Sequence, residues 1–205
     1  MIRRYSDGDR INHWLVAILF LCAGLSGLAF FHPAFFFLTA LFGGGPWTRI
    51  LHPFFGVFMF LGFVGLYVRF WRRNIWRPRD TEWVRNASTL LKGDEDDMPA
   101  VGKNNAGQKA VFWIMAICLA LLLITGVMFW QPWFADGFPI LLRRIAVVIH
   151  ALSATVLILT AIVHIYAAIW VKGSVHAMTR GTVSEAWARK HHLLWYREVT
   201  GHDER

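Results

Sequence analysis

Four histidines lie inside apolar stretches of the sequence that contain no charged residue: His13, His52, His150 and His164. An ionisable side chain inside a membrane span is costly, so a set of four indicates a function. His150 and His164 are fourteen residues apart on one stretch. In a helix, this spacing places them on one face, about 40° apart around the axis and about 21 Å apart along it. Imidazole is an axial ligand of haem iron, so the pattern indicates two haem levels.

The stretches that hold these histidines have the length and composition of transmembrane helices. The chain has 205 residues, of which 56% are hydrophobic and 17% are charged, unlike a typical soluble domain. Four uncharged runs are each long enough to cross a bilayer as a helix, which takes about 20 residues. They comprise residues 11–31, 50–68, 110–130 and 145–171. We therefore predict an all-α integral membrane protein with a four-helix domain over residues 1–172 and a tail over residues 173–205.

The basic residues predict the orientation of these helices. They concentrate before the first span, in the loop of residues 72–109 and after the fourth span, whereas Arg49, Arg143 and Arg144 fall in the other two loops. The positive-inside rule then places both termini and the long loop in the cytoplasm. The net charge of +8 therefore reflects membrane topology. Lipid is an expected partner and nucleic acid is not.

This topology groups the histidines by side of the membrane. The first span enters from the cytoplasm, so His13 shares the inner side with His164. The second span enters from outside, so His52 shares the outer side with His150. Two haems, each held by two imidazoles in a four-helix bundle, require this arrangement. We predict two haem b groups, an outer one held by His52 and His150 and an inner one held by His13 and His164, suited to electron transfer.

His32 is the rival to His52, since both lie near the outer side and both precede a proline. However, His32 lies about 100° from His13 around the first span. His52 opens its span, with Pro53 expected in the first helical turn, where proline is tolerated. These two points favour His52 as the outer ligand.

Small and basic residues accompany the predicted ligands. Gly24, Gly27 and Gly56 leave room for a flat macrocycle, although close packing of helices explains small residues equally well. Arg10 and Arg49 each precede a predicted ligand by three residues, in "RINH" and "RILH". This spacing puts arginine and histidine on one helical face. The arginines are candidate partners for haem propionates, although membrane flanking explains them too.

A second class of function also fits buried histidines. In a haem-free membrane anchor or transporter, they would bond between helices. A proton or cation transporter normally carries a carboxylate inside the membrane. None of the four uncharged runs contains Asp or Glu, which favours the cytochrome.

Several motifs resemble one family of cytochromes. The segments "RINHW", "LHPFFG", "VIHALSA", "VHIYAAIWVKGS" and "GTVSEAWARKHHLLWYRE" resemble the membrane cytochrome b (gamma) subunit of respiratory formate dehydrogenase. The resemblance covers nearly the whole chain. The histidine spacing alone would also suit the cytochrome b subunit of a nickel–iron hydrogenase or another dehydrogenase. The "HIYAAIW" run and the tail favour formate dehydrogenase.

The resemblance implies a three-subunit complex in the bacterial inner membrane. A molybdenum or tungsten (alpha) subunit would oxidise formate, and an iron–sulfur (beta) subunit would pass the electrons to the cytochrome. The cytochrome would deliver them to a quinone, menaquinone or ubiquinone. This chain alone would not oxidise formate. The complex could assemble into a higher oligomer.

The resemblance also implies a quinone site beside the inner haem, lined by Asn105, Gly107 and His164. Asn105 has a second interpretation, because Gln108 follows it by three residues. This spacing matches a capping box at the start of the third span. Both roles are compatible. The histidines of the tail are expected to face solvent; they are His176, His191, His192 and His202.

Overall fold

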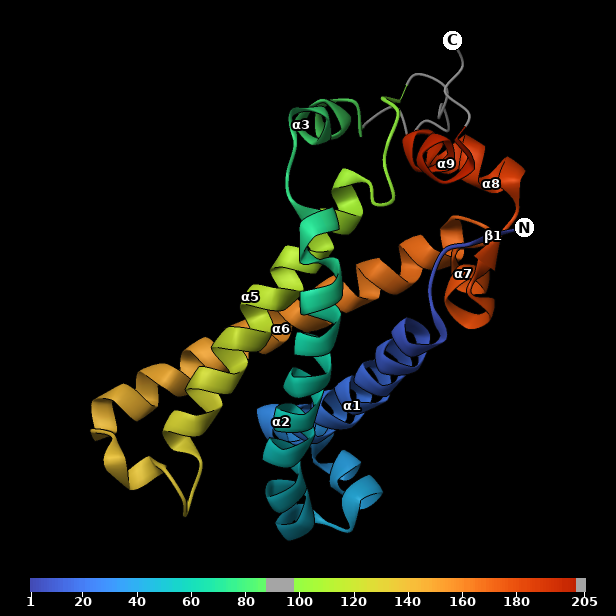
Figure 1. Cartoon of the computed structure of the whole chain (residues 1–205). Coiled ribbons are helices and arrows are strands. Elements are labelled where there is room, and N and C mark those ends of the chain that lie inside the picture. The colour runs from blue at the N-terminus through green and yellow to red at the C-terminus, as the bar shows by residue number, and fades with distance from the viewer. Residues whose placement is uncertain (88–97, 202–205) are drawn as a thin grey trace. The chain divides into compact units, whose positions relative to one another are not determined.

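The structure, a computed structural model, describes residues 1–87 and 98–201, which are mostly helical (Figure 1). Four helices are long and apolar enough to cross a membrane. They are α1 (Asp7–Phe31), α2 (Gly45–Phe70), α5 (Ala106–Phe129) and α6 (Ile140–Trp170). The predicted fold class, an all-α membrane protein with four transmembrane helices, is confirmed. Residues 88–97 of the long loop and 202–205 of the tail, with His202, lie outside the described residues.

Each long helix begins four or five residues before the uncharged run that predicted it. At α1 the start signal is polar and so lies outside the run. At α1, the Asp9 N–H donates to the Ser6 hydroxyl at 3.2 Å, and the Ser6 N–H donates to the Asp9 carboxylate at 3.0 Å. This reciprocal pair is a capping box, which satisfies backbone donors that the first helical turn leaves unpaired.

The expected place of Pro53 in a first helical turn is wrong. Helix α2 begins at Gly45, so Pro53 lies inside it. Pro46 accounts for the earlier start, because a proline in the first turn lacks only an N–H that the helix does not use. The Thr48 hydroxyl also donates to the Gly44 carbonyl at 2.8 Å. His52 therefore lies about two turns into α2, where the helix is already formed.

The chain divides into two compact units. One, which we call the bundle unit, consists of residues 11–68 and 114–163, and the other, the terminal unit, of residues 1–10, 69–113 and 164–205. All four long helices contribute to one apolar core of the bundle unit. Its buried members are Ala23, Met59, Phe63, Cys118, Leu119 and Leu157. Short 3₁₀ helices, η1 (Pro33–Phe42) and η3 (Ala135–Gly137), lie in the connections of this unit.

The terminal unit contains the short elements of the chain. Strand β1 (Ile2–Arg3) pairs antiparallel with β2 (Thr182–Val183). The helices are η2 (Trp71–Asn74), α3 (Pro78–Arg85), α7 (Ser174–Arg180), α8 (Glu185–His191) and α9 (Leu193–Thr200). A second apolar cluster gathers Ala177, Val183, Ala188 and Trp195 from the tail, and Ile2 and Tyr5 pack against it. The tail therefore folds together with the N-terminal segment. The predicted boundary at residue 172 stays a prediction.

The expectation that the tail histidines face solvent is wrong for His192, which is 3% exposed. Its Nδ1 donates to the Gly102 carbonyl at 2.8 Å, and its Nε2 accepts from Arg4 at 3.1 Å. The Arg4 guanidinium lies over the rings of Trp187 and Trp195. Burial, reinforced by the positive charge of Arg4, lowers the pKa of His192 to about 3. The sequence pattern missed this because Gly102 and Arg4 are far from His192 in the chain.

Candidate functional site

The bundle unit brings the two predicted outer ligands close together. His52 extends from α2 and His150 from α6, with their ring centres 6.3 Å apart and their planes inclined by 67°. Two metal–nitrogen bonds of about 2 Å each, with about 1 Å more from each nitrogen to its ring centre, require about 6 Å. The separation therefore fits a metal ion held between two imidazoles.

A hydroxyl group determines which nitrogen of His52 is available. The Ser26 hydroxyl, on α1, lies 2.9 Å from His52 Nδ1 and 2.6 Å from the Cys22 carbonyl. A hydroxyl has one proton, and the carbonyl can only accept, so the Ser26 proton goes to Cys22. Ser26 must then accept a proton donated by His52 Nδ1. This tautomer leaves a lone pair on Nε2, the nitrogen that would bind a metal.

His150 has the same arrangement on the opposite side. Its Nδ1 lies 3.0 Å from the Thr125 hydroxyl of α5, which donates to the Leu121 carbonyl at 2.6 Å. Nε2 of His150 is therefore also the unprotonated nitrogen. Each ring also bonds to a backbone carbonyl, His52 to that of Ala23 and His150 to that of Leu122. With Nε2 unprotonated, each ring retains a lone pair of the kind that binds a metal.

Glycines allow the two imidazoles to lie close to neighbouring helices. A Cβ atom on Gly27 would come within 3.1 Å of His52 Cε1, and one on Gly126 within 3.3 Å of His150 Cε1. Both distances are tighter than ordinary contacts between carbon atoms. A Cβ on Gly24 or Gly56 would meet no atom within 4 Å. The residues present therefore fit a flat group between the histidines.

Sequence reasoning missed Ser26 and Thr125. The signal was available, since each is a hydroxyl residue inside an apolar run and each is followed by glycine. Ser153 is also buried within a span, so a hydroxyl alone does not identify the contact. What distinguishes Ser26 and Thr125 from Ser153 is their short distance to a histidine on another helix.

The inner pair is divided between the two units. His13 belongs to the bundle unit, where its ring meets that of Trp14 edge-on with the centres 5.5 Å apart. His164 belongs to the terminal unit and is exposed on α6. The pairing of His13 with His164 stays a prediction.

The predicted propionate partners differ in their surroundings. The terminal nitrogens of Arg10 bond to the Asp7 carboxylate, at 2.6 Å, and to the Thr179 carbonyl. Arg49 is exposed near the start of α2. Their role toward propionates stays a prediction.

His32, the rival outer ligand, lies outside the long helices. It is exposed and forms the N-cap of η1, where its Nδ1 accepts from the Ala34 N–H at 3.2 Å. His52, in contrast, lies opposite His150. The structure therefore places His52, not His32, close to His150.

The predicted quinone residues Asn105 and Gly107 lie at the start of α5. The Gln108 N–H donates to the Asn105 side chain at 2.9 Å, and the Asn105 N–H donates to the Gln108 side chain at 3.0 Å. The predicted capping box is therefore confirmed. A Cβ on Gly107 would lie 3.4 Å from the side chain of Trp83, in α3. The Asn105 side chain is used by its own helix, and a quinone role stays a prediction.

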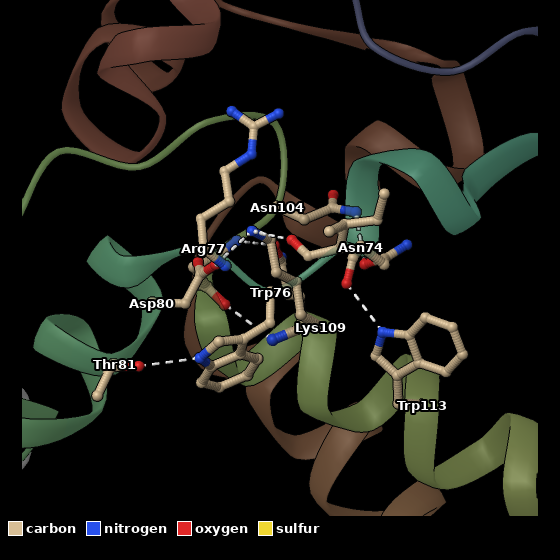
Figure 2. Close-up of polar contacts among 11 residues, drawn as sticks. Asn74, Trp76, Arg77, Asp80, Thr81, Asn104, Lys109 and Trp113 are labelled. Carbon is tan, nitrogen blue, oxygen red and sulfur yellow. Dashed lines mark hydrogen bonds and ion pairs between the residues drawn. The ribbon is translucent and has the colours of Figure 1, made fainter.

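A buried polar cluster fixes the start of α5 in the terminal unit (Figure 2). Lys109 Nζ lies 2.7 Å from the Asp80 carboxylate of α3, and both side chains are at most 5% exposed. The same carboxylate accepts from the Arg77 N–H at 2.6 Å. Trp113 donates its indole N–H to the Asn74 carbonyl at 2.8 Å. These bonds hold α3 and η2 against the end of α5 that carries Asn105.

The chain is similar to known proteins over almost all of its length. The family described as "Prokaryotic cytochrome b561" matches residues 4–181. The cytochrome b556(fdo) subunit of formate dehydrogenase from Escherichia coli strain K12 is 45% identical over 97% of this chain and 93% of that protein.

Two further relatives give a similar result. The nitrate-inducible formate dehydrogenase cytochrome b556(Fdn) subunit of the same strain is 45% identical over 97% of this chain and 92% of its own length. The cytochrome b556 subunit of formate dehydrogenase from Haemophilus influenzae is 40% identical over 96% and 83%, respectively. With its four transmembrane helices, the chain is a multi-pass protein of the bacterial inner membrane. It belongs to the prokaryotic cytochrome b561 family, a family of cytochromes b, whose cofactor is haem b.

Proposed function

We propose that this protein is the cytochrome b subunit of a membrane-bound formate dehydrogenase and carries electrons across the membrane to quinone. The relatives that are 40–45% identical over nearly the whole chain have names that assign them to formate dehydrogenases. In the predicted orientation, an iron–sulfur partner outside the cytoplasm would deliver electrons to the outer haem, and a quinone beside the inner haem would receive them.

The observation that carries the proposal is the geometry of His52 and His150. Their ring centres lie 6.3 Å apart, and each ring donates Nδ1–H to a hydroxyl, which leaves Nε2 unprotonated. A haem held by these two imidazoles would supply one-electron transfer chemistry. Burying a neutral imidazole in the membrane costs less free energy than burying a charged side chain.

A second haem and a quinone site complete the proposal. His13 and His164 would hold the inner haem, and His164 with Asn105 and Gly107 would line the quinone site. Backbone N–H groups at the start of α5 are donors of the kind that a quinone oxygen accepts. Proton uptake there from the cytoplasm would couple electron transfer to the membrane potential.

The partners follow from the same proposal. An iron–sulfur (beta) subunit would deliver electrons, and a molybdenum or tungsten (alpha) subunit would oxidise formate. This chain has two cysteines, Cys22 and Cys118, on different helices. It therefore cannot itself supply the four thiolates that an iron–sulfur cluster needs.

The proposal is tested with the purified membrane complex. Dithionite should produce a reduced b-type α band, and quantification as the pyridine complex should give two haems per chain. Formate alone should reduce the same haems, and added quinone should reoxidise them. Reduction by hydrogen but not by formate would assign the chain to a hydrogenase. A complex without a b-type band would exclude the function.

A further inference from the structure

Two helices that carry no outer ligand each brace one outer imidazole through a pair of adjacent residues. On α1 the pair is Ser26–Gly27, and on α5 it is Thr125–Gly126. In both pairs the hydroxyl accepts from the imidazole Nδ1, and the glycine leaves room for the Cε1 edge of the same ring. Two contacts from neighbouring positions restrict both the position and the rotation of the ring.

We propose that Ser26 and Thr125 are positioning residues that set the redox potential of the outer haem through its ligands. The inference rests on the proposed function, because it requires haem between His52 and His150. A hydrogen bond accepted from Nδ1–H makes the imidazole a stronger electron donor to the metal. Electron donation stabilises ferric over ferrous iron, so the two hydroxyls hold the potential lower than unbraced imidazoles would.

The hydroxyls are polarised for this role by their second hydrogen bond. Each donates its own proton at 2.6 Å to a carbonyl four residues earlier, Cys22 for Ser26 and Leu121 for Thr125. Hydrogen bonds in series strengthen one another, so each hydroxyl becomes a better acceptor toward histidine. A carboxylate would accept more strongly, but an unpaired charge at this place in lipid would be costly. The neutral hydroxyl therefore gives a moderate, fixed effect on the ligand.

Substitutions of Thr125 in the intact membrane complex separate this role from packing. Thr125→Val retains the shape of the side chain and removes the acceptor, whereas Thr125→Ser retains the acceptor. Thr155→Val is the matched control, because the Thr155 hydroxyl bonds to the Ala151 carbonyl of its own helix and is exposed. Ser26→Ala provides the same test at the other ligand. The spectral component that disappears in His52→Ala identifies the outer haem.

The measurement is a spectroelectrochemical titration of the haems in each variant. We expect Thr125→Val to raise the potential of the outer haem by about a threefold change in the one-electron equilibrium constant, equivalent to about 28 mV at 59 mV per tenfold change. Ser26→Ala should shift it in the same direction. The redox potential of the inner haem should not change. In Thr125→Ser and Thr155→Val, the potentials of both haems should equal those of the wild type.

The results distinguish this inference from the proposed function. Wild-type potentials in both Thr125→Val and Ser26→Ala, with both haems retained, would overturn the role of the hydroxyls and leave the cytochrome intact. An equal shift in Thr125→Ser and Thr125→Val would overturn it as well, because packing would then be the cause. Absence of haem from the wild-type complex would instead refute the proposed function.

Discussion

His52 and His192 are both histidines shielded from solvent, one in each unit of the molecule, and they use their nitrogens differently. His192 donates through Nδ1 to Gly102 and accepts through Nε2 from Arg4. His52 donates through Nδ1 to Ser26 of α1 and also bonds to the backbone of Ala23 in that same helix. The fully bonded ring connects distant segments of the chain, whereas the ring with an available Nε2 can bind a metal.

The two units also bury polar groups by different means. In the bundle unit, neutral hydroxyls bond to neutral imidazoles. In the terminal unit, charged groups are paired, as in Lys109 with Asp80 (Figure 2). Charges are costly in hydrocarbon, and a buried ion pair needs further hydrogen bonds to be tolerated. The backbone around Asp80 and Lys109 supplies these bonds. Burial of a histidine alone therefore does not indicate a ligand, and its bonding partners must be considered.

The largest predicted effect is the difference in haem content between alanine substitutions of His52 and of His192. His52→Ala should lower the haem content from two per chain to one and abolish formate-dependent reduction of quinone, because the outer iron loses an axial ligand. His192→Ala should retain both haems, since its ring is used by Arg4 and Gly102. Haem quantification in the purified complex checks both variants. Equal haem loss in the two would contradict the distinction.

A smaller effect should separate the buried ion pair from an exposed one. Asp80→Asn leaves Lys109 buried without a counter-charge and should lower the free energy of unfolding by about 3–5 kcal/mol. Glu198→Gln is the control: the side chains of Glu198 and of its partner Arg73 are 59% and 45% exposed, so removing that pair should cost about 0.2–1 kcal/mol. Denaturant unfolding in detergent measures which of the two substitutions lowers the free energy of unfolding more. A larger loss of stability in Glu198→Gln than in Asp80→Asn would contradict this prediction.

The third difference concerns the pH dependence of stability. The pKa of His192 is lowered from 6.5 to about 3 in the folded protein, so the unfolded chain binds more protons between these values. Stability contributed by neutral His192 is thus present above pH 6.5 and is lost as the pH falls toward 3. The stability of His192→Gln should depend less on pH in this range. If the free energy of unfolding changed equally with pH in the wild type and in His192→Gln, His192 would not be the cause of the pH dependence.

The sequence predicted the membrane helices, and it placed His52 and His150 at the same depth, because both inferences follow from the positions of long uncharged runs. The four uncharged runs identify the helices, and helix direction sets the depth of His52 and His150. The helices start outside the runs, at polar caps such as Ser6 with Asp9 in α1 or at proline, as at Pro46 in α2. The bracing hydroxyls and the burial of His192 depend on contacts between distant segments, which a single sequence does not reveal.

A density map of the membrane complex around His52 and His150 would test the proposed outer haem site most directly. We expect haem iron bound to Nε2 of both rings, with Nδ1 of each within hydrogen-bond distance of Ser26 or Thr125. Density that shows the two rings bonded to each other or to protein groups through Nε2, as His192 is, would contradict it.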